Sequence, residues 1–145
     1  MPLTVGLAMA ISAALGTSTA AAAQAALAPV PPQAQTVQQY VQSYFADAPI
    51  MVAISQCESH FRQYESNGSV FRGAVNNQDV GVMQINEHYH LETAKKLGLD
   101  IYTVQGNTAY ARYLYEHEGV TPWASSSPCW NKSKEAKALA LAANK

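Results

Sequence analysis

The strongest structural signal in this sequence is the segment PIMVAISQCESHF, residues 49–61. A proline suits the first turn of a helix, because the N–H that it lacks would have no partner there. Apolar residues then recur at helical spacing and predict one buried face: Ile50, Ile54, Cys57 and Phe61. Glu58 falls at the margin of that face. The segment therefore predicts a helix over about 49–59 whose acidic side chain is partly shielded from water.

Helical patterns lie on both sides of this segment. Upstream, Thr36 and Gln39 form a capping box, and the apolar residues from Val37 to Phe45 follow a helical period. Downstream, glycines provide stop signals for two more helices. We expect these helices near 88–98 and 103–119, a loop over 121–128, and a final helix over 131–143.

The region between the second and third helices has turn chemistry instead of helical periodicity. Asn67-Gly68 is a strong turn signal, and Ser69-Val70-Phe71 beside it is suited to pairing as a small hairpin. The sequence predicts a mainly α fold with a small β-hairpin element between the second and third helices.

Charge is distributed unevenly along the chain. No charged residue precedes Asp47, and the whole sequence holds nine basic and ten acidic residues for a net charge of −1. Because phosphate binding needs clustered Lys and Arg, this balance argues against a nucleic-acid partner.

The N-terminal part divides into two segments before the folded domain. Residues 1–23 have an apolar stretch and an Ala-rich end, as in a signal peptide, although no Lys or Arg precedes the apolar stretch. An uncleaved membrane anchor and a disordered tail are the alternatives. Residues 24–35 are rich in Pro, Ala and Gln and indicate a linker, which leaves 36–145 as the domain.

Cys57 and Cys129 are the two cysteines of the chain. Neither belongs to a C-x-x-C pair, so zinc and thioredoxin-like sites are disfavoured. In an exported protein, two cysteines favour one disulfide, and two buried free thiols are the alternative.

Two motifs resemble those of a known family. Glu58-Ser59-His60-Phe61, followed by Gly81-Val82-Met83-Gln84-Ile85-Asn86, resembles the pattern of the lysozyme-like transglycosylases, which include lytic transglycosylases and goose-type lysozymes. The resemblance covers about residues 49–130. It implies a lysozyme-like α+β fold and an enzyme that cleaves the β-1,4 bond between N-acetylmuramic acid and N-acetylglucosamine in peptidoglycan.

The resemblance also implies site residues. Glu58 corresponds to the catalytic acid, and its expected shielding agrees, because desolvation keeps a carboxyl protonated near neutral pH. The predicted substrate-binding residues are these: Ser59, Gln84, Asn86, Tyr110 and Trp123. An Ala-Tyr-Asn-Ala-Gly segment typical of many lytic transglycosylases is missing here, so Tyr110 and Trp123 are the aromatic candidates for the cleft, with core packing as their alternative.

The number of carboxylates decides which reaction we expect. Hydrolysis generally uses a second carboxylate, whereas a lytic transglycosylase needs one glutamate, because the sugar's own C6 hydroxyl attacks to give a 1,6-anhydro product. Asp79 lies in a turn-forming stretch where Asp is common for its turn chemistry, and a catalytic role is the alternative. We therefore expect a lytic transglycosylase, with hydrolysis and a non-catalytic glycan-binding module as alternatives.

The four histidines, among them His88 and His90, lack the spacing of a zinc site. We expect no metal and no cofactor. We also expect a monomer that acts on peptidoglycan glycan strands, either secreted or in the periplasm or cell envelope.

Overall fold

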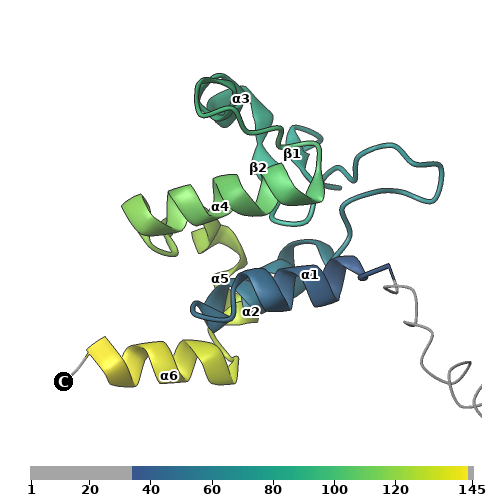
Figure 1. The fold of residues 1–145 in the computed structure, drawn as a ribbon. Helices are drawn as coiled ribbons and strands as arrows, with labels where there is room; N and C mark the ends of the chain where they lie inside the picture. Colours follow the sequence, from purple (N-terminus) through teal and green to yellow (C-terminus); the bar gives the residue numbers. More distant parts are fainter. Residues whose placement is uncertain (1–33, 144–145) are drawn as a thin grey trace, which may run out of the picture. The chain divides into compact units, whose positions relative to one another are not determined.

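The computed structural model describes residues 34–143, which are mainly helical with one small antiparallel sheet (Figure 1). The elements follow in the order α1 (Val37–Tyr44), α2 (Pro49–Ser59), β1 (Asp79–Val80), β2 (Ile85–Asn86), α3 (Glu87–Lys96), α4 (Val104–Glu118), η2 (Thr121–Ser126, a 3-10 helix), α5 (Ser127–Trp130) and α6 (Lys134–Ala143). The predicted fold class is confirmed: helices dominate, and the sheet lies between α2 and α3 in the chain.

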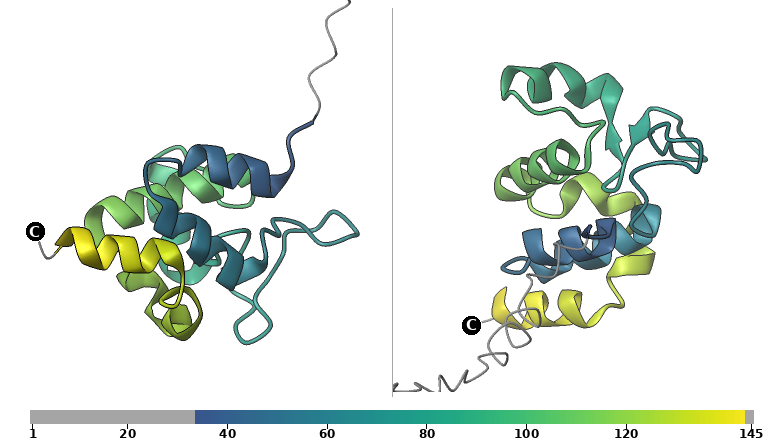
Figure 2. Two further views of the ribbon diagram at one scale, coloured as in Figure 1. Left: turned by 90° about the horizontal axis from the view of Figure 1, so that it is seen from below. Right: turned by 45° about the vertical axis from the view of Figure 1, so that its right-hand side comes forward.

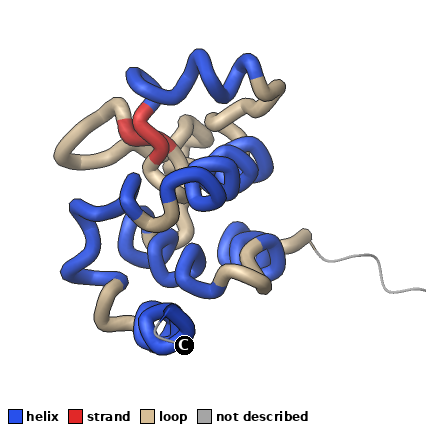
Figure 3. Tube along the Cα trace, turned by 90° about the vertical axis from the view of Figure 1, so that its left-hand side faces the viewer, coloured by secondary structure: helices blue, strands red, loops and turns tan. Residues whose placement is uncertain are grey.

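Helix α4 lies between two groups of elements. In Figures 1 and 2, α3 and the strands lie on one side of α4, while α1 and α2 lie on the other, with α6 beyond them. Figure 3 shows both strands close to α3. Helix α2 packs against α1, α5, α6 and η2.

Helix α2 forms as its sequence predicts. Pro49 occupies its first turn, and Ile50 and Ile54 are buried in the core. The helix ends because His60 and Phe61 both adopt left-handed backbone angles, with φ of 53° and 60°. Such angles stop helical hydrogen bonding and turn the chain away, which leaves Glu58 in the last turn of α2.

The other helix boundaries follow capping chemistry. The Thr36 capping box at the start of α1 is confirmed, with both of its reciprocal hydrogen bonds present. Asn86 caps α3, and Thr103 caps α4, where its hydroxyl accepts a hydrogen bond from Gly106. Helix α6 begins at Lys134, later than the expected 131, because residues 131–133 form the turn that ends α5.

The hairpin predicted beside Asn67-Gly68 is present in reduced form: an antiparallel bridge joins Tyr64 to Val70, and the Phe71 N–H donates to the Gln63 carbonyl at 2.9 Å. The two regular strands lie further along the chain, where β1 pairs with β2 and Val80 lies opposite Ile85. One local prediction was wrong. Residues 121–128 are not a loop but hold η2 and the start of α5. Their prolines occupy first-turn helical positions, which proline favours.

The expected signal peptide at 1–23 lies outside the described residues, as does the linker at 24–35 apart from its last two residues, which have no regular structure. Over residues 34–143, the structure has no helix whose length and apolar character suit a membrane crossing.

In the turn between β1 and β2, the backbone groups of Val82 and Met83 make their hydrogen bonds with side chains. The Val82 N–H donates to Gln63 Oε1 at 2.8 Å, and the Met83 N–H donates to Asn107 Oδ1 at 2.9 Å. The Val82 carbonyl accepts from the Ser59 hydroxyl at 2.7 Å, and the Met83 carbonyl accepts from the Trp123 indole at 2.9 Å. Four side chains from three separate parts of the chain, residues 59–63, Asn107 and Trp123, therefore hold this turn.

The predicted disulfide is confirmed. Cys57 in α2 is bonded to Cys129 in α5, and the two lie 72 residues apart in sequence. The bond links the residue before Glu58 to the C-terminal part of the domain. It thereby fixes α5, and η2 next to it, against the end of α2.

We expect the double substitution Cys57→Ser with Cys129→Ser to lower the free energy of unfolding by roughly 4 kcal/mol, because the open chain gains loop entropy when unfolded. Urea unfolding of the variant and the wild type measures this difference. A loss below about 1 kcal/mol would contradict it.

We expect Gly81→Ala to lower the free energy of unfolding by about 3 kcal/mol or more. Gly81 has φ of +72°, and a Cβ there would lie 2.5 Å from Asn107 Nδ2 and 2.6 Å from Gln63 Oε1. Gly98→Ala is the matched control, because Gly98 has φ of +71° but no atom within 4 Å of the position that a Cβ would take. It should cost only about 1 kcal/mol of backbone strain. Equal losses in the two variants would disprove the crowding at Gly81.

Candidate active site

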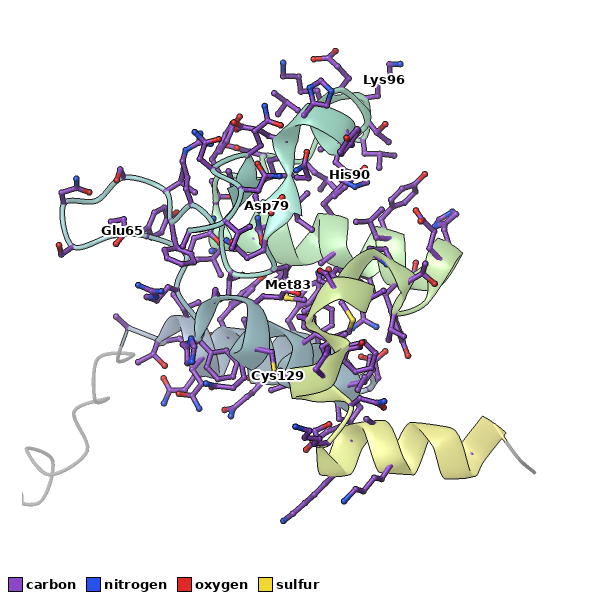
Figure 4. All side chains as sticks on the ribbon, turned by 180° about the vertical axis from the view of Figure 1, so that it is seen from behind. Glu65, Asp79, Met83, His90, Lys96 and Cys129 are labelled. Atoms are coloured by element: carbon purple, nitrogen blue, oxygen red, sulfur yellow. A yellow bond between two sulfur atoms is a disulfide. The ribbon has the colours of Figure 1, made fainter. Side chains whose placement is uncertain are left out.

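A polar pocket of about 160 Å³ lies where the end of α2 meets the sheet, the start of α3 and η2. Glu58 and Asp79 are its two carboxylates. The other residues around it are Gln84, Ile85, Asn86, His90, Leu114, Pro122, Trp123 and Ser125. Figure 4 shows Asp79 and His90 on the side of the sheet and α3, with Met83 deeper between the elements.

Glu58 is half-buried, and its environment favours the protonated carboxyl. Burial raises the pKa of Glu58 above its usual value, and the negative charge of Asp79 adds to this rise, while a hydrogen bond from Ser126 opposes it. The Ser126 hydroxyl donates to Glu58 Oε1 at 2.5 Å. The carboxyl is therefore suited to hold a proton at a pH where an exposed glutamate has lost its proton.

Asp79 is held in place by asparagine side chains. Asn86 Nδ2 donates to Asp79 Oδ1 at 2.7 Å, and Asn76 Nδ2 lies 3.4 Å from the same oxygen. Asn86 also caps α3 through its side-chain oxygen. Because Asp79 and Asn86 are directly opposite each other in β1 and β2, strand pairing brings both into the pocket.

Three of the five predicted substrate-binding residues line the pocket: Gln84, Asn86 and Trp123. Gln84 has a left-handed φ of 50°, and its side-chain amide donates to the Gly81 carbonyl at 2.9 Å. Such a backbone angle persists only where the surrounding structure holds it. Trp123 is only 3% exposed, and its indole N–H bonds the Met83 carbonyl, so it forms part of the pocket wall.

Ser59 and Tyr110 do not line the pocket; each is 1% exposed. The Ser59 hydroxyl supports the Val82 carbonyl instead. The Tyr110 hydroxyl lies 3.1 Å from His90 Nδ1 and thus contacts a residue of the pocket without facing it. Both residues therefore contact groups next to the pocket, Ser59 the Val82 carbonyl and Tyr110 the His90 ring, without lining the pocket themselves.

His90 and Ser126 are site residues that the sequence motifs did not indicate. His90 lies one helical turn after Asn86 on α3, so helical spacing was the available signal. Burial lowers the pKa of His90, which favours its neutral ring. For Ser126 the available signal was the disulfide. Ser126 lies three residues before Cys129, which is bonded to Cys57, and Cys57 directly precedes Glu58.

A larger and more apolar cavity, of about 360 Å³, lies among residues of α2, α4 and α6, including Pro49, Tyr115 and Ala138. Of the two carboxylates that line it, Asp47 is paired with Arg112 at 2.7 Å, and Glu135 lies next to Lys134 in the first turn of α6. The smaller pocket holds a half-buried carboxyl whose pKa is raised by burial, so the pocket around Glu58 is the candidate site.

Among the residues with described positions, His, Cys, Asp and Glu side chains do not gather in threes as a metal site requires. The groups in the pocket are instead suited to proton transfer and to hydrogen bonding of a polar ligand.

Comparisons of the chain with protein-family models, with curated proteins and with solved structures found no match. The resemblance of residues 58–61 and 81–86 to the lysozyme-like transglycosylases therefore stays a prediction. The pocket geometry is independent of that resemblance.

Proposed function

We propose that this protein is a secreted or envelope-associated glycosidase that cleaves the glycan strands of peptidoglycan, with Glu58 as the general acid. The observation that carries the proposal is the half-buried Glu58 carboxyl, whose pKa burial raises, in a polar pocket beside Asp79. A glycosidic bond breaks when such an acid protonates the bridging oxygen.

The character of the pocket supports a sugar as the ligand. Apart from the two carboxylates and His90, its polar side chains are the neutral amides of Gln84 and Asn86 and the hydroxyl of Ser125. Trp123 and Pro122 add apolar surface. No Lys or Arg is among the described residues that line it, which disfavours a phosphate ligand. Neutral hydrogen-bonding groups beside apolar surface suit a carbohydrate.

Two reactions fit a single protonated Glu58. In lytic transglycosylation, Glu58 donates its proton to the bridging oxygen, then accepts one from the C6 hydroxyl of the muramic acid as that oxygen closes the 1,6-anhydro ring. This reaction consumes no water and needs no second carboxylate. It is the reaction expected from the sequence, and it remains our first candidate.

Hydrolysis is the second candidate, and the position of Asp79 favours it. Transglycosylation was expected because Glu58 was the one clear carboxylate in the sequence, but Asp79 lines the same pocket. The Asp79 carboxylate, which accepts a hydrogen bond from Asn86, is placed to act as a nucleophile or as a base that activates water. A non-catalytic glycan-binding module is the third candidate, which an activity assay excludes or establishes.

We expect Glu58→Gln to reduce the release of soluble fragments from purified peptidoglycan by about 10²–10⁴-fold, because the glutamine amide has no acidic proton to transfer to the bridging oxygen. Glu65→Gln is the matched control: Glu65 is exposed, and its variant should keep full activity. Equal release by wild type and Glu58→Gln would refute Glu58 as the acid, and no release by the wild type would favour the binding module.

Asp79→Asn separates the two reactions. If the enzyme hydrolyses the bond, we expect a loss of at least about 100-fold, because the second carboxylate is required. If it is a transglycosylase, activity should stay within about fivefold of the wild type. Mass spectrometry of the wild-type products gives an independent answer, since a 1,6-anhydro end is one water lighter than a hydrolysed end.

The pH dependence of activity tests the electrostatic effect of Asp79 on Glu58. Activity should fall as the pH rises through the pKa of Glu58, since only the protonated acid donates a proton; this fall is the alkaline limb of the pH–activity profile. Asp79 contributes to raising that pKa, so Asp79→Asn should shift the alkaline limb to lower pH. Residual activity of the variant, measured across pH, gives the shift. A limb that stays in place or moves to higher pH would show that Asp79 does not act on Glu58 through its charge.

A further inference from the structure

The Ser126 hydroxyl has two acceptors within reach but only one hydrogen to give. Its oxygen lies 2.5 Å from Glu58 Oε1 and 3.1 Å from the Trp123 carbonyl oxygen. The Trp123 carbonyl already accepts a hydrogen bond from the Trp130 indole N–H at 3.0 Å. Because that carbonyl already has a donor, and because the contact with Glu58 is the shorter of the two, the hydrogen of Ser126 goes to Glu58.

This contact is anchored on both sides. Glu58 directly follows Cys57 on α2, and Ser126 directly precedes α5, which contains Cys129. The disulfide therefore joins the two segments that carry the donor and the acceptor. Ser126 is not among the residues that line the pocket, so it reaches the reaction only through Glu58.

We propose that Ser126 is a positioning residue that donates to Oε1 of Glu58 and so directs the catalytic proton to Oε2. Within residues 34–143, Oε1 is the Glu58 oxygen that takes part in a hydrogen bond, and Oε2 is left for the pocket. A hydrogen already pointing at Oε1 disfavours a second one on that oxygen. The acid is thereby oriented with its proton toward the bridging oxygen of the substrate.

The sign of the effect on Glu58 separates this role from a merely structural one. The donated hydrogen bond stabilises the ionised carboxylate, so it holds the pKa of Glu58 below the value that burial alone would give. Its loss leaves burial unopposed and raises the pKa. A loosened site would instead admit water and lower the pKa toward its usual value.

Kinetic measurements across pH test the proposal, and they rest on the proposed function. For Ser126→Ala we expect kcat to fall about tenfold through misorientation of the acid, with KM within about twofold of the wild type because Ser126 does not face substrate. The alkaline limb of kcat should move up by about one pH unit. Ser126→Thr keeps the hydroxyl and should recover at least about half of the wild-type kcat.

Ser127→Ala is the matched control, since the neighbouring Ser127 side chain makes no hydrogen bond to Glu58 in the described structure and its loss should change neither kcat nor the limb. The proposal is overturned if the alkaline limb of kcat in Ser126→Ala stays in place or moves to lower pH. It is also overturned if Ser126→Thr loses as much kcat as Ser126→Ala.

A second measurement does not depend on glycan cleavage. NMR titration of ¹³C-labelled glutamate side chains, with Glu58→Gln identifying the Glu58 signal, should show a higher midpoint in Ser126→Ala than in the wild type. An unchanged or lower midpoint removes the proposal. If the wild type cleaves no peptidoglycan but the midpoint still rises, the proposed function fails, while the contact between Ser126 and Glu58 stands.

Discussion

The backbone of Val82 and Met83 is buried, yet it makes its hydrogen bonds with side chains from elsewhere in the chain. Gln63, Asn107, Ser59 and Trp123 each satisfy one N–H or carbonyl of this turn. Each buried group left without a partner would cost about 1–3 kcal/mol, so the turn is stable only when all four side chains are in place. The strands on either side carry Asp79 and Asn86, and the pocket therefore depends on the same assembly.

The same architecture sets the environment of Glu58. The end of α2 is fixed from one side by the disulfide to α5 and from the other by the bond between Ser59 and Val82. Glu58, between Cys57 and Ser59, has little freedom to turn toward solvent. Its proton affinity then results from two opposing effects, burial that favours the neutral acid and the Ser126 hydroxyl that favours the anion. A carboxyl balanced in this way is suited to give up a proton and take it back.

Helices α1 to α4 were predictable because their signals are local, whereas η2 and the start of α5 were predicted as a loop. Pro49, the Thr36 capping box and the apolar period of α2 depend on neighbours within a few residues, and the structure confirms them. The Asn67-Gly68 turn signal correctly indicated the pairing of Val70 across that turn, but no local signal indicated β1 and β2. Pairing of Val80 with Ile85 depends on the support of the intervening turn by Gln63 and Asn107, which lie far apart in the sequence.

The sequence alone determined the helical class, the capping box at Thr36 and the placement of Glu58 at the edge of an apolar face, and it favoured the disulfide over free thiols. It also brought Gln84 and Asn86 forward through their motif. Only the tertiary structure placed Asp79, His90 and Trp123 around Glu58, moved Ser59 and Tyr110 behind the pocket, and brought Ser126 to the carboxyl. The physical reason is range: helix formation and capping depend on contacts within one or two turns, whereas the shielding and hydrogen bonding of an acid depend on side chains that meet only when the core has closed.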